Sequence, residues 1–137
     1  MHWEHFAHGA DLGVRGVGKT PAEAFAAAAL AITAAVTDPA AVHAVETVEL
    51  DCEGSETELL LYDWLNAVIF TMSTRRSVYG RFDVEIGPTG LHARLHGERV
   101  DPSRHAPAVE PKGATLTCLK VARAPDGEWR AECVIDI

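Results

Sequence analysis

Two stretches of the chain have the apolar pattern of helices. An alanine-rich stretch predicts a helix from Pro21 to about Thr37, because alanine is the best helix former. Thr20 is suited to cap its start, proline follows at the first helical position, and Glu23 completes a capping box. A second, strongly apolar stretch predicts the core helix from about Glu56 to Ser73, and Ser55-Glu56-Thr57-Glu58 offers another capping box.

Alternation of apolar and polar residues at a two-residue period predicts the strands. Gly87-Pro88-Thr89-Gly90 and Pro125-Asp126-Gly127 are typical of hairpin turns. The predicted strands cover Trp3–Phe6, Gly13–Val17, Val42–Cys52, Phe82–Ile86, Leu91–His96, Ala114–Val121 and Trp129–Ile137, and a polar loop is expected over Gly97–Val109. The order of elements predicts an α+β fold: one domain over residues 1–137, a two-layer sandwich with two helices packed on a mostly antiparallel sheet.

Composition narrows the class of protein. The chain has 137 residues, 47% of them apolar, and no apolar run near the roughly 20 residues of a membrane span. Its net charge of −8 disfavours direct nucleic-acid binding and allows a basic partner. The N-terminus does not resemble a signal peptide, and the three cysteines form no CxxC motif. We therefore expect a cytoplasmic protein with reduced thiols, in which Cys52, Cys118 and Cys133 are small core residues.

One stretch matches a nucleotide-binding motif. Gly13–Thr20 satisfies the pattern G-x-x-x-x-G-K-[ST] of the phosphate-binding loop, in which Lys19 would reach the terminal phosphates. However, His8–Leu12 does not form the buried strand that should precede such a loop, and Thr20 already serves as a helix cap. A P-loop-like nucleotide-binding protein is therefore kept as an alternative to the main prediction.

Histidines offer a second candidate site, for zinc. His2, His5 and His8 would share one face of a helix, but in a strand His5 points away from the other two. Solvated histidines are the simpler interpretation, and His92 and His96 are likewise expected on the solvent face of a strand. No Ser-His-Asp, HExxH or paired-carboxylate pattern supports a hydrolytic or covalent mechanism.

The C-terminal strand brings oxygen donors together. The chain finishes with Asp136 and Ile137, so a side-chain carboxylate and the α-carboxylate lie within a few ångströms of each other. Hard oxygen donors of this kind suit calcium or magnesium when another carboxylate joins them. Asp11, in a turn near the N-terminus, is the candidate third ligand.

Seven short motifs, taken in order along the chain, resemble the archease family. They are His8-Gly9-Ala10-Asp11-Leu12-Gly13-Val14, Gly18-Lys19-Thr20 with Glu23-Ala24-Phe25, Thr37-Asp38, Trp64-Leu65-Asn66, Gly97-Glu98 with Asp101 and Arg104-His105, Lys112 with Thr115 and Leu119, and the final Asp136-Ile137. Two positions depart from the family pattern. Gly9 stands where the family usually has threonine, and Thr117 stands where many members have histidine.

The resemblance implies a function in RNA ligation. Archeases are protein cofactors of the RtcB-type RNA ligase and promote its guanylylation and multiple turnover in tRNA splicing or RNA repair. They are not enzymes themselves, and this chain would meet RNA only through the ligase. The implied metal ligands are Asp11, Asp136 and Ile137, the last through its terminal carboxylate or backbone oxygen. Calcium is the implied ion, with magnesium or manganese as alternatives, and a general chaperone-like interaction module is a second alternative function.

Overall fold

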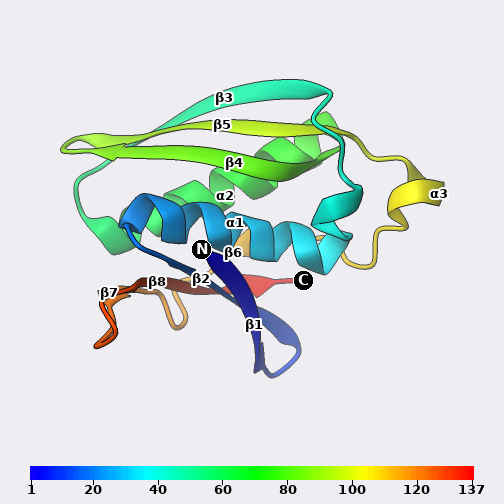
Figure 1. Ribbon diagram of the computed structural model, residues 1–137. Helices are drawn as coiled ribbons and strands as arrows, with labels where there is room; N and C mark the ends of the chain where they lie inside the picture. Colours follow the sequence, from blue (N-terminus) through cyan, green and yellow to red (C-terminus); the bar gives the residue numbers. More distant parts are fainter.

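Two antiparallel sheets enclose the two long helices of the molecule (Figure 1). The computed structural model describes all 137 residues. In chain order the elements are β1 (His2–His8), β2 (Asp11–Gly18), α1 (Pro21–Val36), the 3₁₀ helix η1 (Pro39–Ala41), β3 (Glu46–Glu53), α2 (Thr57–Arg75), β4 (Ser77–Gly87), β5 (Gly90–Arg99), α3 (Pro102–His105), β6 (Gly113–Ala114), β7 (Lys120–Arg123) and β8 (Trp129–Asp136). No helix is long and apolar enough to cross a bilayer.

The strands divide between a five-stranded and a three-stranded sheet. The first has the order β1-β2-β8-β6, with β7 also paired to β8, and the second has the order β3-β5-β4. Helix α1 contacts β2 on one side and β4 on the other, and α2 contacts strands of both sheets (Figure 1). The predicted α+β class, with two helices against antiparallel strands, is confirmed.

The layering differs from the expected single sheet with two layers, because the helices separate the two sheets and make three layers. The physical reason lies in α1. Ala24 and the next several alanines are all buried, as is Phe25, so this helix has almost no solvent face. A helix that is apolar on all sides is stable only between two layers.

Local sequence determines how α1 begins and how closely it approaches the sheet. The hydroxyl of Thr20 accepts a hydrogen bond from the backbone N–H of Glu23 at 3.2 Å, as the capping prediction requires. A Cβ atom at Gly16 of β2 would lie 2.0 Å from the carbonyl oxygen of Ala24. The absence of a side chain at Gly16 therefore lets α1 lie directly on β2.

The N-cap of helix α2 is Glu56, one residue later than the predicted cap Ser55. The carboxylate of Glu56, rather than Ser55, accepts hydrogen bonds from the N–H groups of Glu58 and Leu59, at 3.2 and 2.7 Å. A carboxylate is favoured there because it also faces the positive end of the helix dipole. The indole of Trp64 is fully buried and donates to the carbonyl oxygen of Phe25 at 2.9 Å, which joins α2 to α1.

The structure contradicts two predictions for the C-terminal half of the chain. Strand β5 continues to Arg99, so Gly97–Arg99 is not part of the expected loop. The predicted strand Ala114–Val121 is instead two short strands, β6 and β7, because their registers against β8 differ and the residues between them bulge outward.

The three cysteines are free, and they differ in burial. Cys118 lies in the bulge with φ = 55° and is exposed, contrary to the expected core position. Cys52 is half-buried. Cys133 is buried, and burial raises the pKa of its thiol to about 11, so it is protonated at neutral pH.

Candidate metal-binding site

The predicted ligands Asp11 and Asp136 lie at the same end of the five-stranded sheet. Strands β2 and β8 pair in a register that sets Leu12 opposite Ile135. Leu12–Ile135 is the last pair of this ladder, and the same register continued by one position would set Asp11, the first residue of β2, opposite Asp136, the last residue of β8. Directly opposed residues in an antiparallel pair have Cβ atoms about 4.5–5.5 Å apart. Strand pairing therefore brings together two carboxylates that are 125 positions apart in the chain.

Both carboxylates face away from the helices. Ile135 is fully buried against the core, and successive side chains of a strand point to opposite faces, so Asp136 faces the outer surface. Asp11 shares that face in the same register. Neither aspartate makes an ion pair with a lysine or arginine, so their negative charges are left uncompensated by the protein.

Neighbouring backbone groups hold this end of β8 in place. The N–H of Lys112 donates to the carbonyl oxygen of Asp136 at 2.8 Å, and Gly113 of β6 pairs with Asp136. Strand β6 is in turn held by Asn66 of α2, whose side-chain oxygen accepts from the N–H of Ala114 at 2.9 Å. The Trp-Leu-Asn motif of α2 thus positions the C-terminal strand, a role that sequence reasoning did not assign to it.

The donor set fits a hard divalent cation that retains water ligands. No three His, Cys, Asp or Glu side chains lie close enough to hold a metal ion by themselves. A cation at this edge would therefore need oxygen atoms beyond the carboxylates of Asp11 and Asp136. Ile137 follows Asp136 directly and can add a backbone or terminal oxygen, which suits calcium or magnesium with their preference for oxygen ligands.

The structure contradicts the alternative of a phosphate-binding loop. Residues 13–18 of the motif lie inside β2, where their backbone pairs with β1 on one side and β8 on the other. Their N–H groups therefore do not form the cradle that such a loop needs. A Cβ atom at Gly18 would lie 2.4 Å from the side chain of Glu23, so this glycine allows close packing at the start of α1.

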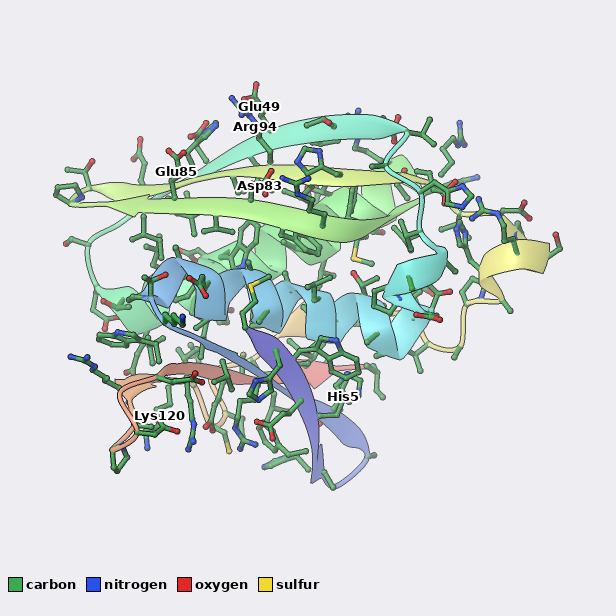
Figure 2. The ribbon with its side chains drawn as sticks, in the orientation of Figure 1. His5, Glu49, Asp83, Glu85, Arg94 and Lys120 are labelled. Atoms are coloured by element: carbon green, nitrogen blue, oxygen red, sulfur yellow. The ribbon has the colours of Figure 1, made fainter.

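The N-terminal histidines form no zinc site. They lie in β1, and Nε2 of His5 is 2.7 Å from the carbonyl oxygen of Ala31 in α1, whereas His2 approaches Glu4 at 3.5 Å (Figure 2). His5 therefore points toward the helix layer. His8 pairs with Asp11 across β1 and β2.

The outer face of the three-stranded sheet carries alternating charges. Glu49 and Arg94 form an ion pair at 3.2 Å and project from this surface (Figure 2). His92 and His96 face outward as predicted. A hydrogen bond with Asp51 raises the pKa of His92. These are exposed pairs of the kind that contribute little to stability.

A buried polar cluster at the end of β5 was not foreseen as a unit. Glu98 accepts hydrogen bonds from the guanidinium of Arg104 at 2.6 and 2.9 Å and from the N–H of His43 at 2.6 Å. His105, which is 3% exposed, lies 3.1 Å from Glu98 through Nε2. The hydroxyl of Thr37 donates to the carbonyl oxygen of His105 at 2.7 Å. This cluster joins β5, α3 and the end of α1, so the Gly-Glu…Arg-His motif has a structural role.

The two positions that depart from the family pattern, Gly9 and Thr117, lie in different loops. Gly9 occupies the turn between β1 and β2 with φ = 58°, where glycine is favoured over a β-branched residue such as threonine. Thr117 is exposed in the bulge between β6 and β7, and its carbonyl oxygen accepts from the N–H of Val134 at 3.2 Å. Neither change removes an oxygen donor of Asp11, Asp136 or Ile137.

Comparison with known proteins gives consistent matches over the whole chain. A family model described as the Archease protein family matches residues 3–137. "Protein archease" of Pyrococcus furiosus is 37% identical over 139 residues, covering 98% of each chain, and that of Methanopyrus kandleri is 36% identical over 141 residues, covering 100% of each. The solution structure of Methanobacterium thermoautotrophicum protein 1598 has a TM-score of 0.81 at 28% identity and covers 98% of both chains. A Thermotoga maritima crystal structure, described as an archease and possible chaperone, has a TM-score of 0.66 at 21% identity, covers 96% of this chain and 94% of its own, and shows likeness of fold.

Proposed function

Because the chain belongs to the archease family, we propose that it is a metal-binding accessory protein that activates an RtcB-type RNA ligase. In this proposal Asp11, Asp136 and Ile137 hold a divalent cation, with calcium as the first candidate and magnesium or manganese as alternatives. The accessory promotes guanylylation of the ligase and does not itself join RNA. The setting is tRNA splicing or RNA repair.

The observation that supports this proposal is the convergence of Asp11 and Asp136 at one end of β2 and β8. Two unpaired carboxylates on one face repel each other, and a cation relieves this repulsion. A bound divalent cation neutralises negative charge on a phosphate group that approaches it. The role of this chain is to hold the ligands at an exposed end of the sheet, where a partner enzyme can reach them.

The acidic character of the chain also favours this kind of partner. The net charge is −8, which disfavours direct contact with RNA phosphates. An enzyme that handles RNA presents basic surface, and complementary charge speeds the encounter of two proteins. We therefore expect association with the ligase to weaken as the salt concentration rises.

The deciding experiment measures guanylylation of the cognate RtcB-type ligase by GTP. The wild-type chain is expected to accelerate it, and Asp136→Asn to lower this stimulation about tenfold or more, because ligand loss costs at least as much as the loss of a supporting partner. Asp126→Asn is the matched control, since Asp126 is an exposed aspartate of the β7–β8 turn. Full stimulation by Asp136→Asn would contradict a metal-based mechanism.

The contribution of Ile137 can be tested separately. A short Gly-Ser extension after Ile137 converts its α-carboxylate into a peptide bond and leaves the backbone oxygen in place. Calcium affinity, measured by isothermal titration calorimetry, is expected to fall if the carboxylate is the ligand and to persist if the backbone oxygen is the ligand.

A general chaperone-like module is the second candidate function. The observation that favours it is exposed apolar surface, above all the side chain of Phe70 on α2, which is 68% exposed. A chaperone of this kind would suppress aggregation of unrelated denatured proteins equally well as wild type, Asp11→Asn or Asp136→Asn. Suppression that is indifferent to both aspartates, together with no effect on ligase guanylylation, would favour this function over the first.

A further inference from the structure

The backbone of Asp136 is held by a neighbouring strand on one side only. The ladder between β2 and β8 ends one residue before Asp136, so this residue has no partner in that ladder. On the other side Gly113 of β6 pairs with Asp136, and the N–H of Lys112 donates to the Asp136 carbonyl oxygen at 2.8 Å. The position of Ile137, the next residue, therefore depends on β6 and the residue before it.

Strand β6 needs support from outside its own sheet. It consists of only two residues, Gly113 and Ala114, and is shorter than most strands in proteins. The carboxamide of Asn66 in α2 gives this support, because it accepts a hydrogen bond from the N–H of Ala114 at 2.9 Å. A backbone N–H can only donate, so the carboxamide atom that faces it is the oxygen. A Cβ atom at Gly113 would lie 3.4 Å from this oxygen, so the glycine gives Asn66 room to approach.

The core fixes the position of Asn66 within α2. Trp64 and Leu65, the two residues before it, are fully buried, and the indole of Trp64 is bonded to α1. Ala114, the partner of Asn66, is only 9% exposed. Loss of the carboxamide would leave a shielded N–H without an acceptor, which is unfavourable, and β6 would have to move to satisfy it.

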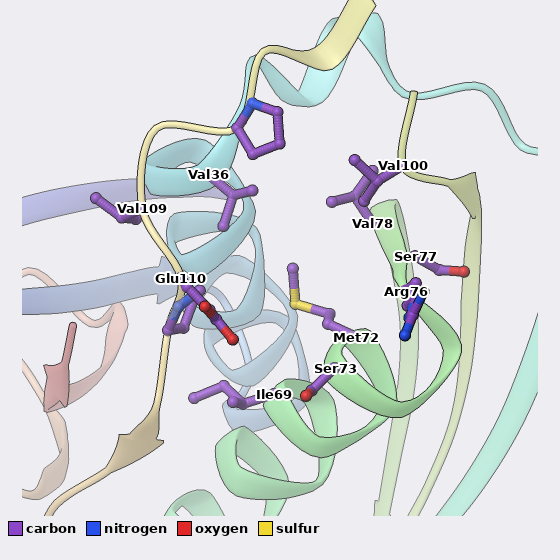
Figure 3. Close-up of a pocket in the computed structure, with 12 residues that line it drawn as sticks. Val36, Ile69, Met72, Ser73, Arg76, Ser77, Val78, Val100, Val109 and Glu110 are labelled. Carbon is purple, nitrogen blue, oxygen red and sulfur yellow. The ribbon is translucent and has the colours of Figure 1, made fainter. Parts of the chain in front are cut away.

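Asn66 makes the only hydrogen bond between α2 and residues 106–119. Packing is sparse on the side that leads into β6, because a cavity of about 490 Å³ lies between the segment 107–111 and the side chains of Ile69 and Ser73 (Figure 3). A second hollow of about 480 Å³, which Asn66 itself lines, shares several residues with this cavity. The carboxamide is therefore the polar link between α2 and the segment that carries β6.

We propose that Asn66 is a positioning residue of the metal-binding site, which sets the affinity for the cation without touching it. The carboxamide fixes β6, and β6 fixes the carbonyl group of Asp136. The direction in which Asp136 and Ile137 present their oxygens follows from this. Residues that orient metal ligands in this way change metal affinity by roughly 10–100-fold. The inference rests on the proposed function, because it requires a cation at Asp11, Asp136 and Ile137.

The test measures binding of calcium to the metal-free chain by isothermal titration calorimetry, with magnesium and manganese as further probes. Asn66→Leu removes the acceptor oxygen and keeps a good helix former, and it is expected to weaken calcium binding about tenfold or more. Asn66→Asp keeps an acceptor oxygen at the same position and is expected to bind calcium as tightly as wild type. Its added negative charge favours a cation, so charge would not explain a loss of affinity.

Thr33→Val is the matched control for a general loss of stability. The hydroxyl of Thr33 is buried and donates to the carbonyl oxygen of Tyr79 at 2.7 Å, so it also links a helix to a strand, but in the three-stranded sheet. Asn66→Leu and Thr33→Val are both expected to lower the midpoint of thermal unfolding in EDTA, and only Asn66→Leu to lower calcium affinity. A second measurement needs no metal. In EDTA the amide proton of Lys112 is expected to exchange with solvent faster in Asn66→Leu than in Thr33→Val.

Three results would overturn the inference: unchanged calcium affinity in Asn66→Leu, an equal loss of affinity in Thr33→Val, or failure of Asn66→Asp to retain binding. If the wild-type chain binds no calcium, magnesium or manganese, the proposed metal site fails and this inference fails with it. If wild type binds calcium and Asp136→Asn does not, whereas Asn66→Leu binds like wild type, only this inference fails and the proposed function stands.

Discussion

Glu98 shows at the scale of one residue how a carboxylate can join three segments of the chain. Glu98 is only 8% exposed, and the partners of its side chain come from the η1–β3 connection and from α3. Hydrogen bonds from Arg104, and next from the backbone N–H of His43, hold the pKa of Glu98 down at about 2. The charged form is therefore the one that the fold stabilises.

This depressed pKa predicts a specific acid sensitivity. A carboxylate with a lowered folded-state pKa contributes stability that is fully present above its ordinary value of 4.5 and is lost as the pH falls toward about 2. We expect the wild-type free energy of unfolding to decline over this window, and that of Glu98→Gln to decline less. At pH 7 the variant is expected to have a lower free energy of unfolding, because Arg104 loses its charged partner.

Urea unfolding of both proteins between pH 2 and 7 provides the measurement. Glu53→Gln is the control, because Glu53 is exposed at the end of β3 and makes no ion pair. Identical pH profiles for Glu98→Gln and wild type would show that the cluster around Glu98 does not couple folding to protonation.

At the scale of elements, the contact between α1 and β2 depends on one glycine. A Cβ atom at Gly16 would meet backbone atoms, the carbonyl oxygen of Ala24 at 2.0 Å and the nitrogen of Ala28 at 2.3 Å. Backbone atoms of a helix cannot rotate out of the way as a side chain can. The helix as a whole must move if this position gains a methyl group.

Gly16→Ala is therefore expected to destabilise the protein by about 1–3 kcal/mol, the usual cost of overpacking. The measurement is urea unfolding at pH 7. Gly87→Ala is the matched control in another strand, since the nearest atom to its added Cβ lies 4.0 Å away. Equal stability of the two variants would mean that α1 can shift on β2 without cost.

At the scale of the whole molecule, the proposed metal ligands connect the two ends of the chain. Strand β2 lies near the N-terminus and β8 at the C-terminus, and they are neighbours in one sheet (Figure 1). A cation shared by Asp11 and Asp136 would bind the folded state and not the unfolded one, in which the two residues are far apart. Binding of that kind raises the free energy of unfolding.

Calcium is therefore expected to raise the midpoint of thermal unfolding, and an excess of a hundredfold over Kd corresponds to about 2.7 kcal/mol. Asp11→Asn is expected to lose this increase while unfolding no earlier than wild type in EDTA, because removing one charge relieves repulsion with Asp136. Asp126→Asn should retain the full response to calcium. An unchanged calcium response in Asp11→Asn would contradict the proposed ligand set.

The sequence by itself determined the class of fold and most of the elements. Caps and turns act over a few residues, so Thr20 and Pro21 predict the start of α1, and Gly87–Gly90 predicts the hairpin between β4 and β5. Apolar periodicity likewise predicts most strands. The family motifs named Asp11, Asp136 and Ile137 as candidate ligands, although no local pattern placed Asp11 beside the C-terminus.

Only the tertiary structure decided how these elements combine. Whether strands form one sheet or two depends on which faces are buried together, and α1 required a layer on each side because its alanines are buried almost all around. The register of β2 on β8, which brings Asp11 and Asp136 to the same end of the sheet, and the convergence of Arg104 on Glu98 depend on pairing between distant segments. Such contacts arise from the packing of the whole chain, and no short stretch of sequence contains the information that specifies them.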